Sequence, residues 1–345
     1  MARDTSGEKY LIFKEMGESI DMTLCVAPKE TPEKLNVYLM DHSKRDGIAA
    51  FDYLLAEDGM KIKEHPQMKG IKKPSLWSRI QLMREHMRNM PKINYPWKQG
   101  DFSVRGFAPT YTYALFDEET TTALLDHARD QKVSLNALLL SALNKVSIEH
   151  LMTEAPEQTV WTIPLNMRGG ASEGNAEVNT TASISLIIPK SMDTAGIDAK
   201  IKSIYMQGVH WGAWLLSNIT GIIGLSAFRY LVKKIKPTWV GVFSNMGSWP
   251  ANDNLDGAID DGRYYVCNPP ATFILPVTTA TITWYGRLSL SLQLHPSICK
   301  DPEGAKQVLA TWVDALTSAI NVDSKKVRQY SLTDKELKDG ATIVN

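Results

Sequence analysis

The segment Val37–Gly47 carries the side chains best suited to chemistry, in the order Val-Tyr-Leu-Met-Asp-His-Ser-Lys-Arg-Asp-Gly. Its apolar first half predicts a short strand that ends at His42, and a neutral imidazole held there can act as a general base near pH 7. Asp46 follows four residues later and either orients the imidazole or pairs with a distant arginine and holds the turn. Gly47 permits a tight or left-handed backbone where the chain turns into a helix.

Two later strand ends carry further candidate residues. Arg168 closes a predicted strand over 160–165 and precedes two glycines. Because a buried carboxylate is costly without a cation beside it, we expect Arg168 to pair with Asp46. Ser244 and Asn245 follow another apolar strand, where a hydroxyl or an amide can stabilise an oxyanion. For all of these residues, His42 included, a purely structural role at a strand end or turn is the alternative.

Composition excludes several classes of function. The chain has 345 residues, and its 38 Lys and Arg balance its 38 Asp and Glu, so no global charge attracts it to nucleic acid. The sequence has no phosphate-binding loop, dinucleotide fingerprint or zinc spacing, so we expect neither a metal nor a cofactor. Its cysteines, without metal spacing or a signal peptide, indicate free structural thiols in a reducing cytoplasm at Cys25, Cys267 and Cys299.

Strands alternate with helices without a strict repeat, which predicts a mixed α/β protein of two unequal lobes. We assign residues 1–100 to an N-terminal lobe with an irregular crossover, and residues 101–345 to a C-terminal lobe. Within the first lobe, residues 10–13 are predicted to form a short strand. The apolar stretch 209–232 predicts a long buried helix, with contact to a lipid surface as the alternative. The last twenty or so residues are polar and are expected to be loose.

Taken in chain order, these motifs resemble the coenzyme A-dependent acyltransferase superfamily. That superfamily includes chloramphenicol acetyltransferase, peptide-synthetase condensation domains, alcohol acetyltransferases and wax ester synthases. The segment 41–47 is similar to its HHxxxDG signature, with Asp41 in place of the first histidine. The further matches, within residues 35–320, are Ile163–Arg168 to the P-V-N-L-R strand, Gly174-Asn175 to the Gly-Asn that follows it, and Val242–Gly247 to the V-S-N-x-x-G strand.

The resemblance implies a two-lobed chloramphenicol acetyltransferase-like fold. It also implies an acyltransferase that moves an acyl group from a thioester, expected to be acyl-CoA, to an alcohol. His42 would be the general base, Asp46 would be held by Arg168 beside Gly47, and Ser244 and Asn245 would lie near the reaction centre. Only 41 residues precede His42, fewer than such proteins usually carry there, so we expect an incomplete N-terminal lobe.

Two other functions stay open at this point. One is a non-catalytic or partner-dependent member of the fold that binds an acyl ligand or another protein. The other is condensation-type amide formation with a donor held on a carrier protein. The expected partners are a small-molecule acyl donor and a hydroxyl acceptor, with no nucleic acid and no metal. A homo-oligomer, a completing partner chain and peripheral membrane contact are also left open.

Overall fold

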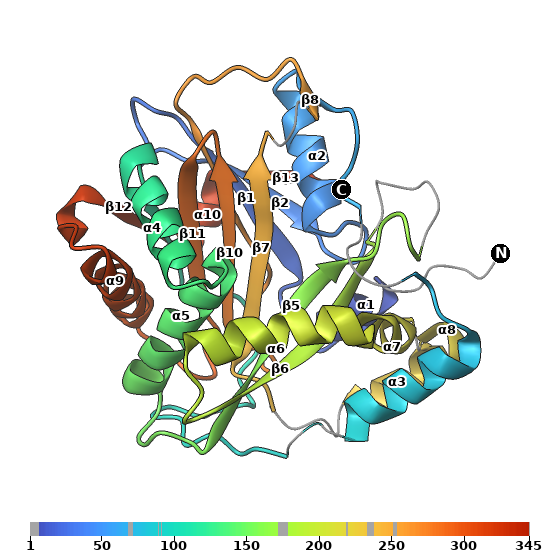
Figure 1. The fold of residues 1–345 in the computed structure, drawn as a ribbon. Helices are drawn as coiled ribbons and strands as arrows, with labels where there is room; N and C mark the ends of the chain where they lie inside the picture. The colour runs from blue at the N-terminus through green and yellow to red at the C-terminus, as the bar shows by residue number, and fades with distance from the viewer. Residues whose placement is uncertain are drawn as a thin grey trace.

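The chain folds into stacked layers of mixed α/β structure. The computed structural model describes residues 7–67, 72–88, 90, 92–171, 179–218, 220–232, 238–250 and 254–344. Within these residues, a seven-stranded mixed sheet lies at the centre of the fold (Figure 1). Helices α4, α5 and α9 cover one face of this sheet, and a four-stranded sheet packs on the other side. The predicted mixed α/β class is confirmed.

The central sheet has the strand order β12-β4-β11-β10-β7-β5-β6. Its strands, in chain order, are β4 (Thr110–Leu115), β5 (Gln158–Asn166), β6 (Thr181–Pro189), β7 (Gly241–Trp249), β10 (Val277–Trp284), β11 (Arg287–Leu294) and β12 (Arg328–Thr333). The smaller sheet has the order β13-β2-β1-β9, from β1 (Asp21–Ala27), β2 (Asn36–Asp41), β9 (Tyr264–Asn268) and β13 (Ala341–Val344). A short ribbon joins β3 (Lys61–Ile62) to β8 (Leu255–Asp256).

Several helices begin where an aspartate or serine side chain accepts a free backbone N–H, as at Asp46, Asp117 and Ser134. In chain order they are α1 (Glu8–Glu15), α2 (Gly47–Glu57), α3 (Leu76–Arg88), α4 (Glu118–Asp130), α5 (Leu135–Leu151), α6 (Thr194–Gln207), α7 (Val209–Ser217), α8 (Thr220–Val232), α9 (Pro302–Ala319) and α10 (Asp334–Asp339), with a 3₁₀ turn η1 (Ser324–Lys326).

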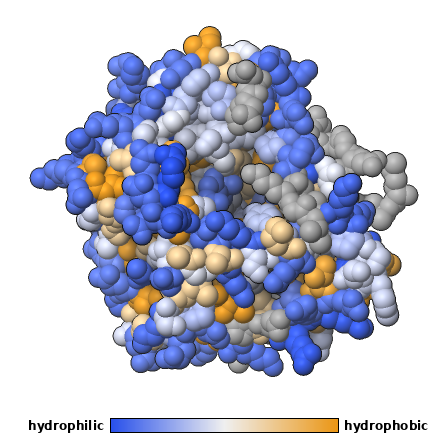
Figure 2. Space-filling model, in the orientation of Figure 1, coloured by the Kyte–Doolittle hydropathy of each residue, from blue (hydrophilic) through white to orange (hydrophobic). Residues whose placement is uncertain are grey.

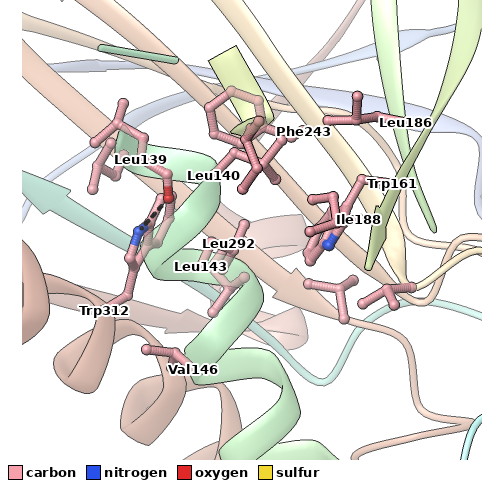
Figure 3. Packing of buried hydrophobic residues seen from close by; sticks show 14 of the residues in the cluster. Leu139, Leu140, Leu143, Val146, Trp161, Leu186, Ile188, Phe243, Leu292 and Trp312 are labelled. Atoms are coloured by element: carbon pink, nitrogen blue, oxygen red, sulfur yellow. Dashed lines mark hydrogen bonds between the residues drawn. The ribbon is translucent and has the colours of Figure 1, made fainter. Parts of the chain in front are cut away.

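The largest core cluster lies between the central sheet and its covering helices (Figure 3). Two of its fully buried tryptophans donate their indole N–H groups to buried oxygens. Trp312 of α9 donates to the carbonyl of Leu139 in α5 at 3.1 Å, and Trp161 of β5 donates to Asn144 Oδ1 at 2.8 Å. Because buried polar groups are costly when unpaired, these bonds hold the helices in one position against the sheet.

Several expectations about single elements are wrong. Residues 10–13 belong to helix α1 rather than to a strand. The expected long helix over 209–232 is divided into α7 and α8, and Gly224 has non-helical angles within α8. The expected loose C-terminal residues form β12, α10 and β13. These residues form regular structure because β12 is hydrogen-bonded to β4 and β13 is hydrogen-bonded to β2, both from distant parts of the sequence.

Strands from both sides of residue 100 share the four-stranded sheet, since β1 and β2 lie between β9 and β13. The division into lobes at that residue stays a prediction.

The three cysteines are buried and free. Among the described helices, none combines the length and the apolar character that crossing a membrane requires.

Gly241 offers a test of how β7 is fixed in the central sheet. A Cβ at this position would lie 1.8 Å from the carbonyl oxygen of Val277 in β10, and backbone cannot move aside as a side chain can. We expect Gly241→Ala to reduce the free energy of unfolding by several kcal/mol, on the order of a severe overpacking substitution. Chemical denaturation followed by tryptophan fluorescence measures the loss.

Gly100→Ala is the matched control, because its nearest neighbour, the Trp97 Cβ, lies at an ordinary 3.5 Å. Its free energy of unfolding should change by less than about 1 kcal/mol. Equal losses in the two variants would contradict the close approach of β7 and β10.

Candidate active site

A cavity of about 160 Å³ lies where the two sheets meet. Its walls come from β1 and β9 of the smaller sheet, from β5, β6 and β7 of the central sheet, and from helix α1. Most of its lining is apolar, and its polar lining residues include His42 and Ser244. The apolar lining residues are Phe13, Met22, Leu24, Ile48, Val242, Met246, Ile274, Leu275 and Ala280.

His42 follows the last residue of β2, as the sequence predicted, and its side chain lines this cavity. Its Nδ1 lies 2.9 Å from the backbone carbonyl oxygen of Arg45. A carbonyl oxygen can only accept a hydrogen bond, so the neutral ring carries its proton on Nδ1. Nε2 is therefore the nitrogen with a free lone pair, which is the requirement for accepting a proton from a ligand.

Desolvation controls the charge of this histidine. Burial lowers the pKa of His42 to about 4, although the Arg45 carbonyl and the carboxylate of Asp46 oppose the shift. The ring of Tyr10 in α1 packs over the imidazole with 4.3 Å between ring centroids, and it removes water from that side. The same desolvation, with the charge of Asp46, raises the pKa of the Tyr10 hydroxyl. His42 is therefore neutral throughout the physiological pH range.

Asp46 is buried and holds the turn rather than the histidine ring. The guanidinium of Arg168 donates to both carboxylate oxygens, at 2.9 and 2.8 Å, so the expected ion pair is present. The carboxylate also accepts the N–H of Ala49 at 3.0 Å, the N–H of Thr180 at 2.7 Å and the hydroxyl of Thr181 at 3.0 Å. Among the described contacts, none joins this carboxylate to the His42 ring.

These contacts tie the loop after β2 to the β5–β6 hairpin. Arg168 follows β5, Thr181 begins β6, and Asn179 just before it donates to the carbonyl of His42 at 3.0 Å. A buried carboxylate is stabilised only when its lone pairs are occupied, and here a cation and several donors occupy them. The histidine therefore keeps its place through its backbone and through the neighbouring turn.

Gly47 does not have a left-handed backbone, which corrects the reason expected for it. It is the first residue of α2 and is not among the glycines with positive φ. A Cβ on Gly47 would lie 2.8 Å from Met246 Sδ of β7. The missing side chain lets α2 approach the strand that carries Ser244.

Ser244 and Asn245 lie within β7 itself, whereas the sequence placed them in the turn after a shorter strand. Both line the cavity. Asn245 donates to Asn136 at the start of α5 and accepts the N–H of Gly247 at 2.6 Å, where the strand bulges against β10. The half-buried hydroxyl of Ser244 has no hydrogen-bond partner among the described residues, which leaves it available to a ligand.

Some contributors to this site gave no signal in the sequence. Tyr10 covers the imidazole from a helix that was expected to be a strand, and the Arg45 carbonyl sets the tautomer through the backbone, which is independent of side-chain type. Thr180 and Thr181 precede the strand predicted over 182–188 and belong to none of the motifs above. Gly174 and Asn175, which contributed to the resemblance, lie outside the described residues. In the part of the chain that is described, no cluster of His, Cys, Asp or Glu could hold a metal ion.

Comparison with known proteins shows the fold. No protein-family model matches the sequence, and no curated protein matches it. The structure is similar to the EpoB cyclization-docking bidomain of a nonribosomal peptide synthetase from Sorangium cellulosum, with a TM-score of 0.50 and 12% identity over 83% of this chain and 60% of that chain. The chain has the fold of the coenzyme A-dependent acyltransferases and condensation domains.

Two further solved structures are similar at lower scores. Polyketide synthase associated protein 5 from Mycobacterium tuberculosis has a TM-score of 0.49 and 16% identity, over 82% of this chain and 73% of that chain. Trichothecene 15-O-acetyltransferase from Fusarium sporotrichioides has a TM-score of 0.47 and 11% identity, over 70% of this chain and 52% of that chain. The chain thus spans about half to three quarters of the length of these structures, and its activity is a matter for proposal.

The Asp46–Arg168 pair can be tested through stability. We expect Asp46→Ala to lower the free energy of unfolding by about 3–5 kcal/mol, because the guanidinium of Arg168 would be left buried without an anion. Urea unfolding followed by tryptophan fluorescence measures the change. Lys306→Ala removes an exposed pair with Glu303 and serves as control, with an expected loss below about 1 kcal/mol. A comparable loss in both variants would show that the buried pair does not hold the turn.

The desolvation of His42 can be tested by titration. Nuclear magnetic resonance of the histidine rings, with His42→Gln used to assign the signal, should show a pKa of about 4 instead of the ordinary 6.5. Because the folded-state pKa is depressed, the unfolded chain takes up this proton first as the pH falls below 6.5. His42 therefore reduces the free energy of unfolding as the pH falls towards 4. A His42 signal that titrates at 6.5 would mean that the ring is solvated.

Proposed function

We propose that the protein transfers an acyl group from an acyl thioester, acyl-CoA in the first instance, to the hydroxyl group of a small-molecule acceptor. The observation that carries the proposal is the state of His42. Its Nδ1 donates to the Arg45 carbonyl at 2.9 Å, and it lines a cavity that also contains the hydroxyl of Ser244, for which no described residue is a partner. Acyl transfer needs a general base and a hydrogen-bond donor for the oxyanion in one cavity, and His42 and Ser244 provide both groups.

The chemistry proceeds through one tetrahedral intermediate. His42 Nε2 takes the proton of the acceptor hydroxyl while the oxygen attacks the thioester carbonyl. The carbon–oxygen double bond opens to an oxyanion, and the Ser244 hydroxyl donates a hydrogen bond to it. The intermediate then collapses, the carbon–sulfur bond breaks, and the thiolate leaves with the proton returned by the imidazolium. The products are an ester and a free thiol, and His42 is neutral again.

Asp46 and Arg168 act in this proposal as positioning residues. Their buried pair holds the loop that carries His42, and the Asn179 amide holds the His42 carbonyl. The apolar walls from β1 and from the segment before β10 suit the hydrocarbon part of an acyl chain or acceptor. A thioester on CoA and one on a carrier protein present the same carbonyl, so both donors belong in the assay.

One observation favours a second candidate function, a binding protein that does not turn over its ligand. A histidine with a pKa of about 4 is a weaker base than one near 6.5, and Tyr10 occupies one side of the ring. In that case the same cavity binds an acyl thioester and leaves it intact. Acyl-CoA binding by the purified protein, without thiol release over a panel of alcohols and amines, would favour this second function.

Substitution of the proposed base tests the mechanism directly. We expect His42→Ala to abolish thiol release from acyl-CoA in the presence of an acceptor, measured with a thiol reagent. Ser244→Ala should lower kcat by about 10²–10³, since one oxyanion donor is removed. His127→Ala, on helix α4, is the control and should keep the wild-type rate. Full activity in His42→Ala would overturn the proposal.

A further inference from the structure

The balanced charge of the whole chain conceals a strongly basic segment. Residues 72–88 contain two lysines, three arginines and one glutamate, so this stretch has a formal charge of +4 while the chain as a whole has a charge of zero. The rest of the protein therefore carries −4. Such an asymmetry creates a local positive potential that attracts anionic surfaces within about 10 Å at moderate salt.

Helix α3 (Leu76–Arg88) displays this charge together with large apolar side chains. It has no fully buried residue. Leu76 is 57% exposed, Trp77 68% and Met87 53%. Arg84 and Arg88 are exposed at helical spacing from Trp77, so the three side chains share one face. Figure 2 shows hydrophobic residues among hydrophilic ones at the lower right, in the region of α3.

The exposed cations of residues 72–88 form no ion pair with the described part of the chain; they are Lys72, Lys73, Arg84 and Arg88. Elsewhere the described structure pairs its arginines freely, as Arg263 with Asp58 and Arg287 with Asp260. The exposed face of α3 thus keeps its charge available for an external anion.

The helix is also held rigidly with this face outward. Its opposite side packs on α7, where a Cβ on Gly212 would lie 2.5 Å from the backbone nitrogen of Met83. Such a close approach of two helices fixes the rotation of α3, so its exposed face is a convex ridge rather than a detachable peptide. A helix that binds in a partner's groove must expose its whole apolar face. Helix α3 instead packs one side against α7, and its remaining convex face suits a flat surface.

We propose that the exposed face of α3 binds the surface of an anionic lipid bilayer, with Leu76, Trp77 and Met87 inserted at the headgroup level and Arg84 and Arg88 on the phosphates. Tryptophan is favoured at membrane interfaces because one end of its ring is apolar and the other polar. Long arginine side chains place their guanidinium among headgroups while their stems cover apolar surface. Nucleic acid is less suited, because the exposed aliphatic side chains would meet phosphates.

Sedimentation with lipid vesicles tests the proposal on the full chain. The wild type should bind vesicles of phosphatidylcholine with phosphatidylglycerol, should bind vesicles of phosphatidylcholine alone far less, and should be released by added salt. The variant Arg84→Glu/Arg88→Glu should raise the lipid concentration for half binding by about tenfold or more, because each basic residue near an anionic surface contributes several-fold. Trp77→Ser should weaken binding without changing its salt dependence.

Two control variants match these changes elsewhere on the surface. Lys325→Glu/Lys326→Glu reverses two exposed charges in η1, and Ile259→Ser removes a side chain that is 74% exposed. Both should bind vesicles like the wild type. The proposal is overturned if the wild type does not bind the anionic vesicles, if the α3 variants bind as tightly as the controls, or if the protein retains a duplex oligonucleotide but no vesicles. Since thiol release is not measured, the result is independent of the proposed acyl transfer.

Discussion

The structure depends most on one buried ion pair, between Asp46 and Arg168. The pair joins the turn after β2 to the end of β5, so it connects the smaller sheet to the central one. The pair is needed because burial of either charge without the other is energetically costly. The carboxylate is further saturated by backbone and hydroxyl donors, including the N–H that begins α2. The two sheets therefore meet in one arrangement, and the cavity between them has a defined shape.

The position of His42 follows from this arrangement and not from a direct bond to Asp46. The imidazole is oriented by the Arg45 carbonyl and covered by Tyr10, while its backbone is held by Asn179. This separates two tasks that often fall to one residue. The carboxylate keeps the loop in place, and a backbone group sets the tautomer. A base held in this way retains a free Nε2, and the proposed acyl transfer draws on that property.

Much of the fold could be predicted, and the failures have physical causes. Periodicity and capping residues predict helices over 48–56, 120–130, 134–151 and 302–320, within two residues of α2, α4, α5 and α9, because amphipathic spacing and N-caps are local properties. The prediction of a loose C-terminal segment was wrong because short polar segments become strands only when neighbouring strands supply their hydrogen bonds. β7 extends past Ser244 for the same reason, since its outer residues pair with β10. The single long helix expected over 209–232 was wrong because the stretch also contains Ser217, Asn218 and several glycines; α7 ends at Ser217, and Gly224 has non-helical angles within α8.

The sequence by itself determined the candidate residues and one contact between them. His42 at a strand end and Asp46 with a distant arginine followed from spacing and from the cost of a buried charge. The tertiary structure alone decided that the imidazole is oriented by the Arg45 carbonyl and not by Asp46, that Gly47 leaves room for Met246, and that a helix places Tyr10 over the base. It also decided that α3 turns a basic, apolar face outward. The reason is that orientation, burial and desolvation depend on elements far apart in the chain, and no local pattern encodes where they meet.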